Sequence, residues 1–476
     1  MPGRPGSRPP LGAESRPTLP NAKVPYDTAG DEQAAREAMV AAQLKVWRRH
    51  LPGLFQKMSH IADPRRAGSV RHRLTVVLFY GLLLFIFQYA SRREANRNVT
   101  SPTLADALRH VFPDLLSIPH YDTVERMLRT IPVDEWEAVL HDRVTTILRQ
   151  HGVQRYLVSH RWVVAVDGTQ KFARHQAFAD EALRQRLSDR DTQYRVYVLE
   201  AVLVTGQGLT LPLMTTFAEN HTGADTDTKQ DCEQKAFRRL ARRLKAWFPR
   251  RRLLLILDGL YPNGPVMTLC RQNHWDFMMV LPRDCLPSVW DEVAGLIALD
   301  TDDEQYATYH WGDRDQQFRW VNAIDYAYRA PTGQMLRQRV HVALCQETWV
   351  DADGRSHRAL WAWISGQRLD ADNIVARCNR AGRHRWAIEA EFLIEKRYGD
   401  HFEHAYSYNW AALKGWHYLM KLAHLLNVLT LWSQVGSDLL KRRGYRDTIR
   451  FLRETWTGRW LSPAFLQARC MGSLAP

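Results

Sequence analysis

The stretch HRWAIEAEFLIEKRYG (384–399) carries three glutamates, Glu389, Glu391 and Glu395. It has no proline, and its only glycine is its last residue, so the pattern predicts a helix. At about 100° per residue, Glu391 and Glu395 point roughly 160° and 120° away from Glu389. Apolar side chains flank the sector of Glu389, so this face is expected to pack on other elements, whereas Glu391 and Glu395 are most simply solvated.

Two basic residues share the sector of Glu389 on this predicted helix. Arg385 and Lys396 fall with Glu389 within roughly 40° of the helix circumference. A guanidinium one turn before a carboxylate and an ammonium two turns after it could hold that carboxylate and contact a phosphate. The alternative is a purely structural Arg385–Glu389 pair.

Two aspartates end apolar runs that are predicted to be strands. Asp167 ends VVAVD and Asp258 ends LLLILD, and a glycine follows each of them. Ligand sites of α/β sheets lie at the carboxyl ends of strands, although either aspartate alone could simply begin a turn. Close carboxylates repel unless a cation neutralises them, and Mg²⁺ prefers oxygen ligands. We therefore expect a divalent-cation site at Asp167 and Asp258, with Glu389 as its third ligand.

The composition is that of a soluble globular protein with a basic net charge, and its cysteines favour a reducing compartment. The 476 residues include 65 Lys+Arg and 51 Asp+Glu, a net charge of +14 that suits a polyanionic partner. The six cysteines never form a CxxC pair, which argues against a zinc ribbon or a disulfide framework. Residues 74–90 are nearly all apolar but fall short of a membrane span, so a buried core helix is expected and a membrane anchor is the alternative.

Turn residues and changes of hydrophobic period divide the chain into regions. The first is expected to be a disordered tail, and the second is all-helical and could either dock on DNA or act as a scaffold. Then strands and helices in α/β order enclose a β-rich insertion, before a helical C-terminal region. The boundaries are 1–30 for the tail, 31–155 for the helical N-terminal region, 156–298 with 368–432 for the α/β domain, 299–367 for the insertion, and 433–476 for the C-terminal region.

These motifs together resemble the DDE transposases of bacterial insertion sequences, in the subgroup with a Y-x2-R-x3-E-x6-K signature. Arg385, Glu389 and Lys396 reproduce R-x3-E-x6-K, and VVAVDGTQ and LLLILDGLY resemble the strands of the first two acidic residues. The resemblance covers roughly residues 161–430. The chain departs from the pattern at Gly382, where the subgroup has a tyrosine that helps to position DNA; Arg383 or Tyr398 could substitute for it.

The resemblance implies a ribonuclease H-like catalytic domain, a mixed sheet with flanking helices. Asp167, Asp258 and Glu389 would hold two divalent cations, Mg²⁺ or Mn²⁺, for in-line cleavage and joining of DNA strands. Arg385 and Lys396 would contact phosphates. The implied partners are double-stranded DNA with the inverted repeats of transposon ends, and a second copy of the chain in a synaptic homodimer. The implied location is the bacterial cytoplasm, associated with the nucleoid.

Further residues are candidates for DNA contact. The resemblance implies that an insertion aromatic such as Trp311 or Trp320 can stack on a flipped base, although core packing is the commoner role of a tryptophan. Trp361 and Trp363 are expected to pack in a hairpin. A basic stripe in residues 238–245 could follow a DNA backbone or be a solvated helix face.

Two other functions remain open at this stage. A nuclease with the same domain would cut DNA without joining it, and an inactive relative would bind DNA without cutting it. A zinc site at His401 and His404 is a weak candidate, because no further ligand completes it.

Overall fold

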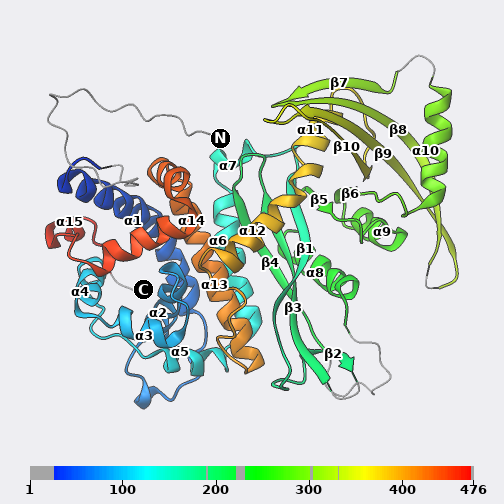
Figure 1. Cartoon of the computed structure of the whole chain (residues 1–476). Coiled ribbons are helices and arrows are strands. Elements are labelled where there is room, and N and C mark those ends of the chain that lie inside the picture. Colours follow the sequence, from blue (N-terminus) through cyan, green and yellow to red (C-terminus); the bar gives the residue numbers. More distant parts are fainter. Residues whose placement is uncertain (1–25, 189–190, 221–230, 301–303, 331, 473–476) are drawn as a thin grey trace, which may run out of the picture.

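The computed structural model describes residues 26–188, 191–220, 231–300, 304–330 and 332–472. A helical body built from both ends of the chain lies on one side of a ten-stranded mixed sheet (Figure 1). At the other end of the sheet lie β7 to β10 and α10 (Figure 1).

The helical body combines N-terminal and C-terminal helices. The N-terminal elements are α1 (Ala29–Ser59), η1 (Ala67–Ser69), α2 (Leu74–Ile86), α3 (Arg92–Val99), α4 (Pro102–Val111), α5 (Tyr121–Leu128), α6 (Val133–Leu148) and α7 (His151–Gln154). The C-terminal helices are α13 (Trp410–Leu431), α14 (Gln434–Thr457) and α15 (Pro463–Gln467). Both ends of the chain meet here: the Trp456 indole donates to Gln43 Oε1 at 2.7 Å, and Arg36 donates to Thr455 Oγ1 at 2.9 Å.

Two helices form the centre of this body. All 13 residues of α2 are buried, which confirms the core helix predicted from its apolar run. Helix α13 packs against α1, α2, α5 and α6 and is buried on nearly every side. The N-terminal helices cover the face that would otherwise meet water. Within the described ranges, no helix is long and apolar enough to cross a membrane.

The sheet has the order β2-β3-β1-β5-β6-β10-β9-β8-β7, with β4 also paired to β3. Its strands are β1 (Trp162–Arg174), β2 (Leu183–Ser188), β3 (Asp191–Val204), β4 (Thr210–Ala218), β5 (Leu253–Leu257), β6 (Asp276–Val280), β7 (Tyr306–Trp311), β8 (Arg314–Arg329), β9 (Met335–Val350) and β10 (Ser356–Ser365). Strands β1, β5 and β6 are parallel neighbours, and the other pairs are antiparallel. The chain is therefore a mixed α/β protein with helical ends, as predicted.

Side chains of β1 alternate between two packed layers. Val164 and Val166 belong to the core that includes α8 (Glu233–Trp247), whereas Val163 and Ala165 belong to the core that includes α12 (Trp386–Arg397). β5, LLLIL, is buried at all five positions, as a strand covered on both faces must be. Helix α9 (Gly264–Gln272) then connects β5 to β6, as its sequence predicts.

The β-rich insertion joins the central sheet. After α10 (Pro287–Leu299), its last strand β10 pairs antiparallel with β6, so its strands extend the sheet. The predicted hairpin is β9 and β10, and its turn ends at Gly354, whose φ of 80° suits glycine. α11 (Ile374–Asn379) and the turn η2 (Gly382–Arg385) lead from β10 to α12.

Candidate functional site

Asp258 directly follows β5, as predicted, but the prediction that Asp167 ends its strand is wrong: β1 continues to Arg174, because β3 stays paired with it to that residue. β1 and β5 are parallel, with Ala165 opposite Ile256, so Asp167 and Asp258 both follow two residues later at the same level of the sheet. Asp167 Oδ1 accepts from the amide of Gly168 at 2.8 Å, and Asp258 Oδ1 accepts from the amide of Leu260 at 2.9 Å. The strands and these local bonds fix both carboxylates at the end of the sheet where β5 stops. This end, marked by Asp167 and Asp258, is the acidic edge.

Arg385 connects this edge to Glu389. Its guanidinium lies 3.5 Å from Asp167 Oδ2 and donates to Glu389 Oε1 at 2.6 Å. Arg385 ends the η2 turn and caps α12, and it is only 6% exposed. Glu389, one turn further, keeps a side chain that is 40% exposed. The structure thus brings together Asp167, Asp258, Arg385 and Glu389.

Negative charge exceeds positive charge at this edge. Burial, with a smaller contribution from the charges of Asp258 and Glu233, raises the pKa of Asp167 to about 6, against the opposing effect of the Gly168 amide and Arg385. Because the pKa of this carboxyl group is raised so far, a bound cation would stabilise its ionised form. The donor set, all carboxylate oxygens, suits Mg²⁺ or Mn²⁺.

Glu233 is a residue of this region that the sequence did not reveal. It is the first residue of α8, which packs on the opposite face of the sheet from α12. The hydroxyls of Tyr197 and Tyr261 donate to its two carboxylate oxygens at 2.6 and 2.7 Å. An acidic residue at a helix start is so common that its sequence gives no signal.

Lys396 lies further along α12. It is two turns, or about 10 Å, beyond Glu389, and its ammonium is 3.4 Å from Glu403 Oε1. The common helix face is as predicted, but the partner of Lys396 is Glu403 and not Glu389.

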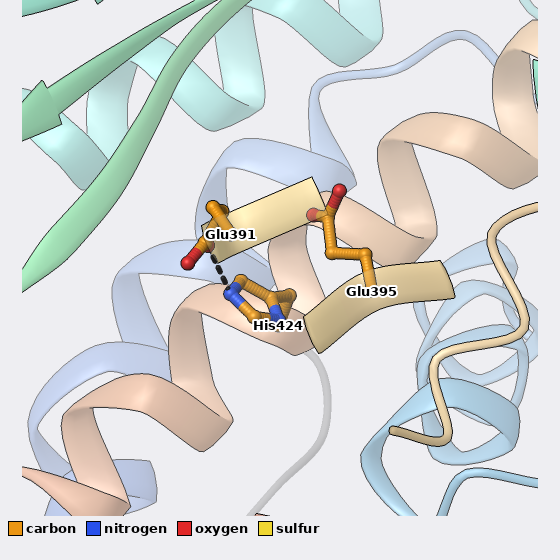
Figure 2. Close-up of side chains that lie close together, drawn as sticks. All are labelled: Glu391, Glu395 and His424. Carbon is orange, nitrogen blue, oxygen red and sulfur yellow. Dashed lines mark hydrogen bonds and ion pairs between the residues drawn. The ribbon is translucent and has the colours of Figure 1, made fainter. Parts of the chain in front are cut away.

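The prediction that Glu391 and Glu395 are solvated is wrong. Their exposed fractions are 3% and 0%. Glu391 accepts bonds from His424 and, at 2.7 Å, from Thr210 Oγ1, and Glu395 accepts from the Lys421 ammonium at 2.6 and 2.8 Å. Figure 2 shows Glu391 and Glu395 on α12 facing His424 of α13. The second face of α12 is therefore a buried ionic interface.

This buried cluster has the spacing of a metal site but already holds its own cations. Glu391, Glu395 and His424 are the one trio of His, Cys, Asp and Glu among the described residues whose ligand atoms all lie within 4.8 Å of one another. Burial opposes the charge of His424, but Glu391 and Asp400 outweigh it and raise its pKa well above the ordinary value. Lys421 sits on Glu395, and burial raises the pKa of Glu395 to about 7. The cluster is an internally neutralised network that anchors α12 to α13.

The carboxylates of the acidic edge lie farther apart than the ligand atoms of that cluster. Asp167, Asp258 and Glu389 do not all lie within 4.8 Å of one another, and Arg385 stands between Asp167 and Glu389. His401 and His404 form no group with metal-ligand spacing in the described part of the chain.

An aromatic cleft of about 500 Å³ adjoins the acidic edge through the η2 turn. Arg383 and Arg385 are two residues apart: Arg383 points into the cleft and Arg385 contacts Asp167. Arg383 lies 5.1 Å from the ring centre of Trp311 and 4.9 Å from that of Trp361. The remaining lining residues are Gly312, Asp313, Arg314, His384 and Trp386.

The two candidate tryptophans for DNA contact differ in their exposure. Trp311 is 38% exposed at the cleft, whereas Trp320 is 4% exposed. Trp320 therefore has no free face for a base, and its candidate role in DNA contact is corrected to core packing. Trp361 and Trp363 stack at 6.0 Å with ring planes 7° apart, which confirms their hairpin packing.

Side-chain packing explains why a glycine, Gly382, stands at the position of the signature tyrosine. A Cβ at Gly382 would lie 2.9 Å from Trp363 Nε1, so the indole of Trp363 fills the space where a side chain would begin. Arg383 cannot act freely in place of the tyrosine, because it is bound to Glu347 and to Asn379 Oδ1. Tyr398, the other candidate, is 42% exposed at the end of α12.

The basic stripe of α8 divides into two groups. Arg239 is bound to Asp231, Arg243 to Glu137, and Lys245 to backbone carbonyl oxygens, so these three hold the fold together. Arg238 and Arg242 are exposed.

Comparison with known proteins adds one finding. Residues 55–142, from the end of α1 into α6, match the model of a family described as DDE_Tnp_1-associated, a region associated with DDE transposases. A comparison with curated proteins gave no match. The matched residues lie wholly in the helical body, outside the acidic edge, so this similarity is independent of the motifs around Asp167, Asp258 and Glu389.

Proposed function

We propose that the chain is a DDE-type transposase that cleaves DNA at the ends of an insertion sequence and joins the freed ends to a target. The observation that carries the proposal is the placement of Asp167 and Asp258 at the same level of the sheet, with Arg385 joining Asp167 to Glu389. The transposase-associated match at residues 55–142 supports it from a separate part of the chain. The order of β4, β3, β1, β5 and β6, in which only β3 runs antiparallel to the other four, supports a ribonuclease H-like sheet.

The donor set fits two divalent cations. Asp167, Asp258 and Glu389 would hold Mg²⁺ or Mn²⁺, and Arg385 is the cation that already lies against two of these three carboxylates. Bound there, the ions would offset the negative charge that develops at the phosphate and on the leaving oxygen.

The protein residues would orient the strand for two in-line displacements at phosphorus. In the first, a water oxygen bonds to phosphorus while the 3′-oxygen leaves with a proton. In the second, the oxygen of that 3′-hydroxyl bonds to a target phosphorus while the 3′-oxygen of the target strand leaves and takes up the proton. Arg385 is placed to donate to a non-bridging phosphate oxygen beside Asp167, and Lys396 to a phosphate further along the strand. The aromatic cleft beside Arg383 would take an unpaired base close to the cleaved bond.

The test uses a duplex of the DNA that flanks the coding region of this chain, with Mn²⁺. Asp167→Asn, Asp258→Asn and Glu389→Gln should each lower cleavage by roughly 100-fold or more and leave DNA binding nearly unchanged. The exposed residues Asp372 and Glu292 offer matched controls, Asp372→Asn and Glu292→Gln, which should cleave like the unmodified protein. Wild-type cleavage by any of the three site variants would remove that residue from the site.

Two alternatives give different results in the same assay. A nuclease would cut the duplex but would not join a pre-cleaved 3′ end to a second DNA. An inactive relative would bind the duplex and neither cut nor join it.

The DNA around the coding region offers a separate test. Inverted repeats bounded by short direct repeats there would favour the transposase over both the nuclease and the inactive relative.

A further inference from the structure

Glu233 is the most tightly positioned acidic side chain near Asp167 that the proposed reaction has not used. Its two oxygens accept from Tyr197 of β3 and from Tyr261, which follows β5. A glutamate at the start of a helix is usually solvated, but this one is fixed at both oxygens by side chains of two other elements. Each oxygen retains a lone pair for a further partner.

Gly168 makes the approach of Glu233 possible. A Cβ at Gly168 would lie 2.1 Å from the Tyr197 hydroxyl and 2.7 Å from Glu233 Oε2, closer than any side chain can come. Glu233 therefore lies directly against the backbone of Gly168 on the α8 face of β1. The carboxylate of Asp167 lies against the same residue, because its Oδ1 accepts from the Gly168 amide. The two carboxylates thus border one glycine from opposite sides.

The donors to Glu233 leave its charge in place. Both are phenols, and a phenol donates a hydrogen bond without supplying positive charge. Tyr197 lies on β3, the strand paired with β1, and Tyr261 follows β5, so the two donors hold Glu233 beside the strand of Asp167 and beside the end of β5 that Asp258 follows.

We propose that Glu233 is a fourth carboxylate of the divalent-cation site, held in place by the Tyr197 and Tyr261 hydroxyls. The inference rests on the proposed function, since it assumes that cations bind at Asp167 and Asp258. It assigns α8 to the site as well as β1, β5 and α12. A purely structural Glu233 would instead only tie α8 to β3 and to the segment after β5.

The test measures Mn²⁺ binding to the whole protein by calorimetry and by the loss of the free-ion electron paramagnetic resonance signal. Glu233→Gln keeps the shape of the side chain and one oxygen acceptor, so the fold should persist. We expect the dissociation constant for Mn²⁺ to rise roughly tenfold, which is within the range of affinity losses seen when groups around a metal are changed. The melting temperature without Mn²⁺ should stay equal or rise, because a repelling charge is removed. Glu292→Gln on α10 is the matched control and should bind Mn²⁺ like the unmodified protein.

The outcomes separate the inference from the function on which it rests. Loss of Mn²⁺ binding in Asp167→Asn together with unmodified affinity in Glu233→Gln would overturn only the role of Glu233. Unmodified affinity in Asp167→Asn, or no Mn²⁺ binding by the unmodified protein, would overturn the metal site itself and Glu233 with it. Should Glu233→Gln not fold, Tyr261→Phe removes one donor from the same carboxylate; unchanged Mn²⁺ affinity in that variant would also reject the role.

Discussion

At the scale of single residues, the ionisation of Asp167 affects both the stability of the fold and the proposed cation site. Its pKa is raised from 3.8 to about 6, so the folded protein holds this proton more tightly than the unfolded chain. The stabilising contribution is complete below about pH 4 and is lost as the pH rises through 6. Above that pH, the ionised group opposes folding unless a cation neutralises it.

Asp167→Asn should therefore stabilise the protein in the absence of divalent cations. At pH 8 we expect the free energy of unfolding in urea to rise by about 1–3 kcal/mol, because the ionisation cost is removed. At pH 4 the gain should vanish, and Asp372→Asn should show no such gain at either pH. A variant that is less stable than the unmodified protein at pH 8 would contradict the raised pKa.

The aromatic cleft makes a second prediction at this scale. Trp311 and Trp386 are exposed at the cleft and can offer ring faces to unpaired bases. Trp311→Ala or Trp386→Ala should weaken binding of single-stranded or frayed DNA by about 1–3 kcal/mol per stacked base. Trp432, which caps α13 and is as exposed as Trp311 at 38%, provides the control Trp432→Ala. Equal losses in Trp311→Ala and Trp432→Ala, measured by fluorescence titration, would exclude stacking at the cleft.

At the scale of elements, α12 is held by charges on the face opposite to Glu389. Lys421 of α13 is bound to Glu395 and to Glu200 of β3, and all three are at most 1% exposed. One ammonium thus joins α12, α13 and the sheet. Because Glu389 lies on α12 and Arg385 caps its start, this interface determines where those two residues face Asp167.

Lys421→Met should destabilise the protein far more than the same change at the surface of α12. It leaves the Glu200 and Glu395 carboxylates buried without their cation, which costs about 3–5 kcal/mol. Lys396→Met removes a lysine from a half-exposed pair with Glu403 and should cost less than about 1 kcal/mol. Urea unfolding of both variants checks the difference. Similar losses would mean that Glu395 takes up a proton and needs no ammonium.

The sequence predicted the local elements better than their partners. β1 and β5 were predictable because apolar β-rich runs mark buried strands. Their parallel register brings Asp167 and Asp258 to the same level of the sheet, although β1 itself continues to Arg174. Glu391 and Glu395 were not predictable, because their partners His424 and Lys421 lie about thirty residues away on another helix. Glu233 was missed for the same reason, because its hydrogen-bond donors Tyr197 and Tyr261 come next to it only when the sheet has formed. Helical period alone indicates a direction, whereas burial depends on what packs there.

At the scale of the whole molecule, the two chain ends form one helical body around α13. The transposase-associated residues 55–142 supply most of its N-terminal half, and they share a hydrophobic core with the α8 face of the sheet. The loop after α12 also reaches this body, where His404 and Tyr406 meet residues of α3 and α5. The proposed catalytic edge and the N-terminal helices are therefore parts of one packed structure.

Under the proposed function, a cleft at this junction is a second candidate place for contact with DNA. It has a volume of about 400 Å³ and is lined by Arg92, Arg93 and Asn96 of α3, by His120, and by His404. Arg92 is already close to Asp122 and Glu125, at 3.7 and 3.6 Å, whereas Arg93 is exposed. With a net charge of +14, the protein should bind DNA in a strongly salt-dependent way, and Arg93 is the side chain of this cleft best placed to contribute.

Arg93→Ala should weaken binding of any duplex sequence to a similar degree, because a phosphate contact does not read bases. Titrations between 50 and 200 mM salt should show the slope of log affinity against log salt reduced by about one, the value for one lost phosphate contact. Arg442→Ala removes the same charge from the exposed side of α14 and should leave the slope unchanged. Equal slopes in Arg93→Ala and the unmodified protein would restrict DNA contact to the catalytic side of the molecule. A loss confined to one end sequence would instead make this cleft a reader of sequence, which a single guanidinium on a phosphate cannot be.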